Sequence, residues 1–196
     1  LSENHTRINF TLDGYNIEEI VKGNRTYKRI SYPGEGDFAV PGKPDLPNFT
    51  RMFAIPDAGN VRLQISGAEE EIISDIAVFP RRELKIDGEP LSTDFTIDTD
   101  FYENGTVFPE QIVVLGEPAI FRDYRVVTVS ISPFQYDPVK QELRVIRSID
   151  LDLVCTGTGG TNIKTTNRKI SRFFEPMYKS AIDNYDSIAS RDGEYQ

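Results

Sequence analysis

Apolar residues recur at every second position in several short stretches of this chain, and this period constrains the fold more than any other sequence feature. In residues 61–65 and 127–131 each apolar side chain is followed by a polar one, which is typical of a β-strand with one buried face. A turn at Asp137-Pro138 follows the second stretch, so residues 124–154 are predicted to form an antiparallel meander or pair of hairpins. Other predicted strands are residues 6–13, 27–31, 50–55, 71–79, 111–115 and 149–155.

Turn-forming residues separate these stretches throughout the sequence. The chain of 196 residues contains 14 glycines and 12 prolines. Short strands at this spacing favour an all-β fold over a fold in which helices alternate with strands. We therefore predict an antiparallel β-sandwich with one long loop, in a chain long enough to bury a sizeable core.

The C-terminal part of the sequence changes to a helical period. From Phe173 to Ile188 the apolar residues recur at spacings of three and four, which predicts an amphipathic helical segment over about residues 172–188. This segment either packs on its own sandwich or packs partly on a following domain, and both alternatives are open. Residues 1–188 are assigned to one domain, and the polar residues 189–196 to a linker that leads to a further domain.

Composition argues against several classes of function. The chain has one cysteine, Cys155, and one histidine, His5, so neither a Cys–His catalytic pair nor a zinc site is expected. The glycine-rich residues 157–160 lack the lysine of a phosphate-binding loop, and no cofactor is predicted. A net charge of −9 argues against nucleic-acid binding, and no apolar run is long enough to span a membrane. The chain is therefore not expected to be an enzyme.

Residues 81–108 are the least regular part of the sequence, and no lysine or arginine occurs from Ile86 to Phe121. A connection of this length without clear secondary structure is usually functional or disordered. Its acidic side chains offer the oxygen ligands that a calcium ion prefers, and a solvated acidic loop without metal is the alternative. The candidate calcium ligands are Asp94, Asp98, Asp100, Glu103 and Asn104.

Five segments, in order along the chain, carry a resemblance to a known family. They are the motif Gly42-x-Pro44-x-Leu46-Pro47, residues 108–112, residues 118–125, residues 132–139 and residues 178–185. Together they resemble the prodomains of gingipain-type cysteine peptidases, peptidase family C25. The resemblance extends over about residues 40–190, whereas residues 1–35 match only loosely.

The resemblance implies a fold, a partner and a mechanism. It implies a β-sandwich prodomain that is made in cis with a caspase-like cysteine peptidase catalytic domain, which would follow residue 196. Such a prodomain keeps the peptidase latent by inserting a loop into its active-site cleft, and assists its folding. The resemblance also implies a bacterial protein that is secreted, periplasmic or on the cell surface. The N-terminal residues lack the basic and apolar regions of a signal peptide.

The same resemblance points to the residue that enters the specificity pocket. Aligned between Pro80 and Pro109, the inhibitory position falls at Asp87, followed by Gly88 and Glu89. Arg81, Arg82 and Lys85 are the alternatives if the loop is shifted, and an Asp-Gly dipeptide is also an ordinary turn sequence.

The tripeptide Asp-Gly-Glu recurs at residues 192–194, where the junction with the catalytic domain would lie. This repetition predicts a processing junction at Arg191, Asp192 and Gly193 and a peptidase that prefers aspartate. A cut after Arg191, by a peptidase that prefers arginine, is the alternative.

A free-standing adhesion or carbohydrate-binding β-sandwich is the rival hypothesis from another class of protein. Such a module should display a cluster of exposed aromatic side chains on one face. The 12 phenylalanines and 9 tyrosines could supply this cluster, although the chain has no tryptophan.

Overall fold

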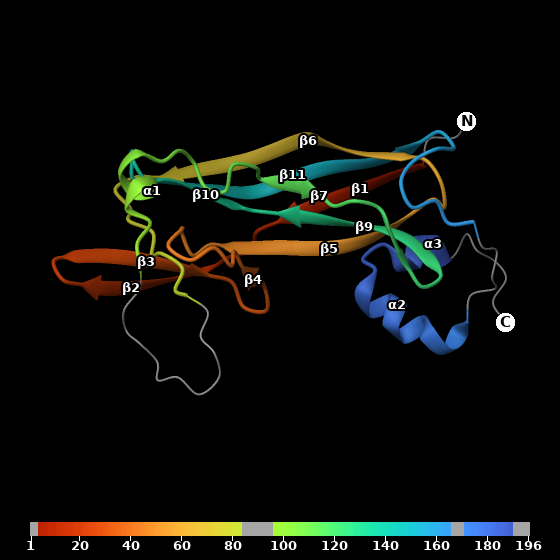
Figure 1. The fold of residues 1–196 in the computed structure, drawn as a ribbon, viewed down its shortest axis with the longest axis horizontal. Helices are drawn as coiled ribbons and strands as arrows, with labels where there is room; N and C mark the ends of the chain where they lie inside the picture. Colours follow the sequence, from red (N-terminus) through yellow and green to blue (C-terminus); the bar gives the residue numbers. More distant parts are fainter. Residues whose placement is uncertain (1–3, 84–95, 166–170, 190–196) are drawn as a thin grey trace.

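The computed structural model describes residues 4–83, 96–165 and 171–189. It consists mainly of antiparallel strands with a few short helices (Figure 1). In chain order the elements are β1 (Asn4–Thr11), β2 (Asn16–Lys22), β3 (Arg25–Ser31), β4 (Gly36–Asp37), β5 (Pro47–Ile55), β6 (Asn60–Ile73), α1 (Thr99–Asn104), β7 (Val113–Leu115), β8 (Ala119–Phe121), β9 (Tyr124–Ile131), β10 (Phe134–Asp137), β11 (Glu142–Thr156), the 3-10 turn η1 (Arg172–Phe174), α2 (Glu175–Ala181) and α3 (Tyr185–Ala189).

The first sheet is built around β11. On one side, β11 pairs antiparallel with β6 from Leu143 opposite Ile73 to Thr156 opposite Asn60. On its other side, β11 pairs with β10 near its start and with β1 along the rest of its length. The side chains of Leu143, Val145 and Leu151 are completely buried, so the predicted alternation buries one face of this sheet.

The second sheet is built around β9, which lies between β5 on one side and β7 and β8 on the other. Strand β4 extends the sheet beyond β5, and β2 and β3 form a separate hairpin. Val127, Val129 and Ile131 of β9 face the core that lies between the sheets, together with residues of β11. The predicted all-β sandwich is thus confirmed.

Several sequence-based expectations need correction. The strand predicted at 71–79 is wrong in its second half, because β6 ends at Ile73 and Asp75 has a left-handed backbone (φ 58°). Strands β9 and β10 are not neighbours in a meander, since the chain crosses to the first sheet between them, whereas β10 and β11 do form a hairpin. Strand β2 was not predicted because most of its side chains are exposed, so it lacks a buried face.

The C-terminal helical segment is present but divided. Helix α2 ends before Ile182, whose backbone is extended (φ −108°, ψ 112°) and forms a bridge with Met52 of β5. A second short helix, α3, follows it. None of the helices within the described ranges is long and apolar enough to cross a membrane.

Arg125 closes one end of the sandwich. Its side chain is completely buried, and its guanidinium donates hydrogen bonds to backbone carbonyls of Pro56 (3.0 Å), Gly59 (3.0 Å), Thr161 (2.7 Å) and Asn162 (3.0 Å). These carbonyls belong to two loops that are distant in sequence. A buried cation that donates to carbonyl oxygens of both loops joins them to the start of β9.

We expect Arg125→Met to lower the free energy of unfolding by about 3 kcal/mol, because the loop carbonyls lose their charged donor inside the protein. Urea unfolding followed by circular dichroism measures this change. Arg7→Met is the matched control. Its side chain is 68% exposed and its ion pair with Asp152 is 3.6 Å long, so its effect should stay below about 1 kcal/mol. Equal effects of the two substitutions would contradict the role of Arg125.

Candidate functional site: the segment between Arg81 and Asp98

The predicted site residues fall into two groups. Lys85, Asp87, Gly88, Glu89 and Asp94 lie outside the described residues, as do Arg191, Asp192 and Gly193 of the predicted junction. The structure does place the residues at both ends of the predicted inhibitory segment. These are Arg81, Arg82, Asp98 and Asp100.

Arg81 is committed to contacts within its own domain. Its Nη1 lies 2.9 Å from Asp37 Oδ2 and 2.9 Å from Asp45 Oδ1. Asp45 is 4% exposed, and its other carboxylate oxygen lies 3.6 Å from Arg29 Nε. Burial raises the pKa of the Asp45 carboxyl, and the contact with Arg81 opposes this rise. If the Arg81 side chain entered the cleft of a peptidase, the buried Asp45 carboxylate would lose its closest cation. An unpaired buried charge destabilises the domain.

Arg82 has no comparable ion pair among the described contacts. Its side chain is exposed, and its guanidinium carbon lies 5.4 Å from the centre of the Phe79 ring. An exposed cation beside an aromatic ring is held only weakly. Arg82 is therefore more available than Arg81 to contact another molecule.

Asp98 holds the other end of the segment. Its carboxylate accepts a hydrogen bond from the backbone N–H of Phe101 at 3.0 Å, as the N-cap of α1, and lies 2.8 Å from Lys43 Nζ. The hydrogen bond from Lys43 lowers the pKa of Asp98 below its usual value, and the hydrogen bond from the Phe101 N–H lowers it further. Lys43 also lies 4.2 Å from the centre of the Phe101 ring, which is buried in the core. Helix α1 is thus fixed to the sandwich by its first turn.

The predicted calcium ligands are not gathered within the part of the chain that is described. Asp98 is occupied by Lys43 and by the helix N-terminus, and Asp100 accepts a hydrogen bond from Asn104 at 3.4 Å. The described residues contain no group of three or more acidic, histidine or cysteine side chains that could hold a metal ion. Asp94 lies outside these residues.

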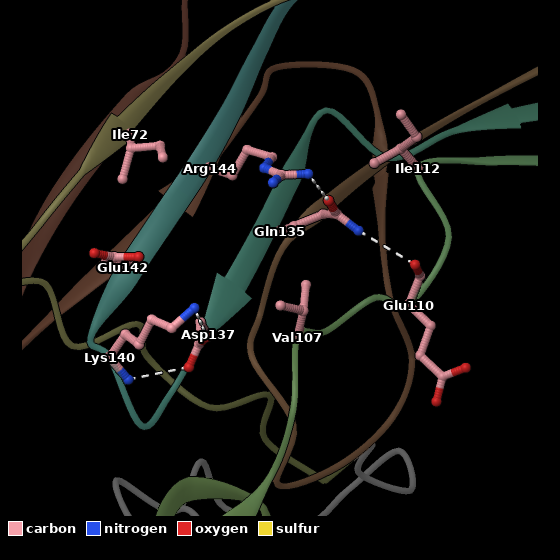
Figure 2. Close-up of a pocket in the computed structure, with 9 residues that line it drawn as sticks. All are labelled: Ile72, Val107, Glu110, Ile112, Gln135, Asp137, Lys140, Glu142 and Arg144. Atoms are coloured by element: carbon pink, nitrogen blue, oxygen red, sulfur yellow. Dashed lines mark hydrogen bonds and ion pairs between the residues drawn. The ribbon is translucent and has the colours of Figure 1, made fainter. Parts of the chain in front are cut away.

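A pocket of about 380 Å³ lies between β10, the start of β11, the end of β6 and the chain before β7 (Figure 2). Its polar groups bind one another. Gln135, which is 5% exposed, donates from Nε2 to the Pro109 carbonyl at 2.8 Å and accepts from Arg144 at 3.4 Å. Asp137 accepts from the backbone of Lys140 at 3.0 Å and contacts its Nζ at 3.3 Å. These contacts hold the chain before β7 on the sheet, which is a structural role.

A larger cavity, about 760 Å³, is lined in part by Asp100, Phe101 and Phe108 of the predicted inhibitory segment. It is bounded by α1, by residues 105–111 and by strands β5, β7 and β9. Lys43 and Phe101 line it together with Phe108 and Ser130. The C-terminal part of the predicted inhibitory segment therefore lines an open cavity.

The C-terminal helices cover part of the outer face of the second sheet. Tyr178, Ile182 and Tyr185 are buried against Ala54 and residues of β9. In Figure 1 α2 and α3 lie at one end of the molecule and α1 at the other. Of the two alternatives for this segment, packing on its own sandwich is therefore observed.

The contact between this segment and β5 imitates strand pairing. Asn184 Oδ1 accepts a hydrogen bond from the Ala54 N–H at 2.8 Å, and its Nδ2 donates to the Ala54 carbonyl at 2.9 Å. The N–H of Asp183 donates to the Met52 carbonyl at 2.8 Å. The Tyr178 hydroxyl is also hydrogen-bonded to the Asp123 carboxylate. The edge of β5 is thereby covered and its backbone groups are satisfied.

The exposed aromatic cluster that the rival binding module needs is not found in the described ranges. Phe173, 83% exposed, is the one phenylalanine or tyrosine there whose side chain is largely in solvent. Arg122 lies over its neighbour Phe174, 3.6 Å from the ring centre. A single exposed ring does not form a binding platform.

Comparison with known proteins gives a consistent result. The family model Propeptide_C25 matches residues 2–191. Gingipain R1 of Porphyromonas gingivalis is 24% identical over 182 residues, which are 92% of this chain and 18% of that protein. Lys-gingipain of the same bacterium is 19% identical over 189 residues, or 93% of this chain and 11% of that protein. The chain thus spans less than a fifth of these relatives.

Two solved structures share the fold. The complex of Porphyromonas gingivalis RgpB pro- and mature domains includes a chain that superposes with a TM-score of 0.81 at 22% identity, covering 93% of this chain and 92% of that one. A structure concerned with the zymogenic latency of gingipain K from Porphyromonas gingivalis gives a TM-score of 0.65 at 17% identity, covering 79% of this chain and 88% of that one.

We expect Tyr178→Phe to destabilise the chain by about 1 kcal/mol near neutral pH, because Asp123 loses its hydrogen-bond donor. Burial, reinforced by the Asp123 carboxylate, raises the pKa of Tyr178 to about 12, whereas an unfolded phenol titrates near pH 10. The stabilisation is therefore complete below about pH 10 and is lost as the pH rises to about 12.

The stability difference between wild type and Tyr178→Phe should accordingly shrink across that interval. Urea unfolding from about pH 8 to about pH 12 measures this difference. A difference that stays constant would show that Tyr178 does not titrate in this way.

Proposed function

Because this chain belongs to the Propeptide_C25 family, the prodomains of gingipain-type cysteine peptidases, we propose that it keeps such a peptidase latent by placing part of residues 81–108 in the active-site cleft. It also assists the folding of that peptidase. The observation that carries the proposal is the family match, which extends over nearly the whole chain and includes both this segment and the C-terminal helices. The sandwich then acts as a rigid platform from which the segment is presented.

The residue that enters the specificity pocket is Asp87 in this proposal, with Gly88 and Glu89 after it. The contacts of Arg81 support a residue further along the segment, because its guanidinium is bound to Asp37 and Asp45. Arg82 and Lys85 are the alternatives. A basic group in the pocket of the peptidase would complement Asp87.

A preference for aspartate also accounts for the sequence at the proposed junction. Asp192 and Gly193 repeat the dipeptide found at residues 87–88, so one pocket could receive both. A cut after Arg191 fits a peptidase that prefers arginine instead. In the first case the peptidase would cleave reporter peptides after aspartate, and in the second case after arginine.

The partner in this proposal is a caspase-like catalytic domain that follows residue 196 in the same polypeptide. A tethered inhibitor has a high effective concentration at its target, and cutting the tether removes this advantage. In the structure the last described helix, α3, is packed on β5 rather than extended away from it. The cut is thus proposed to lie beyond a firmly attached end of the prodomain. Because Gingipain R1 and Lys-gingipain come from a bacterium, we place this protein among bacterial secreted, periplasmic or cell-surface proteins.

We expect Asp87→Ala to raise the inhibition constant of this chain at least tenfold, because a specificity-pocket contact of about 1.4 kcal/mol is lost. The measurement adds the chain to a gingipain-type catalytic domain and follows cleavage of reporter peptides with aspartate or arginine before the cut. Glu69→Ala, a change to an exposed side chain of β6 outside the proposed inhibitory segment, is the control and should leave the constant unchanged.

The same assay separates the alternatives. If Arg82→Ala or Lys85→Ala weakens inhibition and Asp87→Ala does not, the assignment of Asp87 is wrong although latency stands. If the unaltered chain inhibits no gingipain-type peptidase, the proposal of latency fails.

We also expect the gene to encode a catalytic domain with a cysteine and a histidine nucleophile–base pair directly after residue 196. Sequencing the reading frame downstream tests this expectation. A stop codon or a repeat array at that place would contradict it and would favour a free-standing module.

A further inference from the structure

The turn at Gly42-Lys43 makes backbone contacts with Arg81 and with Asp98, which lie on either side of Asp87 within the proposed inhibitory segment (residues 81–108). On the N-terminal side, the Gly42 N–H donates to the Arg81 carbonyl at 2.9 Å, and the Arg81 N–H donates to the Lys43 carbonyl at 2.7 Å. On the C-terminal side, the Asp98 N–H donates to the Gly42 carbonyl at 3.2 Å. One short turn is therefore hydrogen-bonded to residues that are far apart along the chain.

Side chains strengthen the same junction on both sides. Lys43 is paired with Asp98 at 2.8 Å, and Arg81 is paired with the buried Asp45, which follows the turn. The N–H of Asp45 also donates to the Phe79 carbonyl at 2.8 Å. Arg81 and Asp98 are thus each held by backbone hydrogen bonds and by an ion pair.

The turn itself is fixed to the core of the sandwich. Leu46 is completely buried in the hydrophobic core, and its carbonyl accepts a hydrogen bond from the Phe38 N–H at 3.2 Å. Strand β5 begins at the next residue, Pro47. The separation between the two ends of the segment is therefore set by the sandwich.

Glycine is required at position 42 for two reasons. Its φ is +80°, a conformation that side chains other than glycine rarely adopt. A Cβ at this position would lie 3.0 Å from the backbone nitrogen of Asp98 and 3.3 Å from its Cβ. A side chain there would require Asp98 to move by a few tenths of an ångström, whereas no Arg81 atom is among the three heavy atoms nearest to that Cβ.

We infer that the Gly42-Lys43 turn is a positioning clamp that determines how strongly the chain inhibits its peptidase. By holding Arg81 and Asp98 against one turn, the clamp removes much of the freedom that residues 82–97 would otherwise lose on entering a cleft. Preorganisation of this kind strengthens binding by lowering its entropy cost. The inference rests on the proposed function. In it, the Gly-x-Pro-x-Leu-Pro motif positions Arg81 and Asp98.

The test compares Gly42→Ala with Gly34→Ala. Gly34 has nearly the same φ, +83°, but a Cβ there meets nothing within 4 Å. Both variants place a side chain at a positive φ, and only Gly42→Ala displaces Asp98. We expect Gly42→Ala to raise the inhibition constant roughly tenfold and Gly34→Ala to leave it within about twofold of wild type, in an assay with a gingipain-type catalytic domain that wild type inhibits.

A second readout separates positioning from general damage to the structure. Affinity is measured for the same catalytic domain after its active site has been blocked covalently, so that the segment cannot enter. Gly42→Ala and wild type should bind this blocked domain equally. If both glycine variants weaken inhibition alike, or if Gly42→Ala weakens binding to free and blocked domains equally, the clamp is refuted.

Lys43 provides an independent variant if Gly42→Ala fails to fold in a thermal melt. Lys43→Met removes the ion pair with Asp98 and should weaken inhibition several-fold, and Lys43→Arg should restore it. No difference between these two variants would also refute the clamp. Absence of inhibition by wild type would refute the proposed function instead.

Discussion

The pairing of β11 with β6, β1 and β10 is the constraint on which the rest of the structure depends. It spans residues 142–156 on both edges of β11 and places one face of the strand in the core. The second sheet then packs its own inner face against this surface through β9.

Strand β5 connects the two ends. The Gly42-Lys43 turn lies just before its first residue, and the loop that Arg125 binds lies just after its last. At one end, the Arg125 guanidinium joins two loops, and at the other, one turn binds both Arg81 and Asp98. Both sets of hydrogen bonds use backbone groups as partners. They therefore depend on the course of the backbone more than on which side chains lie nearby.

This arrangement suits the proposed role as a prodomain that inhibits a tethered peptidase. In that proposal the rigid sandwich, with Arg81 and Asp98 fixed to it, contributes inhibition through preorganisation, while the tether contributes effective concentration. The two proposed contributions are separable, since a cut beyond α3 would remove the tether and leave the clamp in place. The C-terminal helices are buried against the sheet by Tyr178, Ile182 and Tyr185, so a cut after them need not unfold the domain.

The sequence by itself was sufficient for the fold class and the family. Alternation of apolar residues identified most of the strands because one face of each is buried, and the ordered motifs identified the prodomain because they extend through the chain. Exposed β2 and the short, capped helix α1 were missed, since neither has a buried stripe long enough to show a period. The segment of residues 81–108 was recognised as unusual from its length and from the absence of lysine and arginine between Ile86 and Phe121.

Only the tertiary structure showed that Arg81 is held within its own domain. In the sequence Arg81, Arg82 and Lys85 were the alternatives to Asp87, and the ion pairs of Arg81 with Asp37 and Asp45, distant along the chain, distinguish it from Arg82. The meeting of Gly42 with both Arg81 and Asp98 has no local signal either, although the glycine motif itself was visible. Contacts between distant residues depend on how the sheets pack, and the period of a sequence carries information only about each strand's own faces.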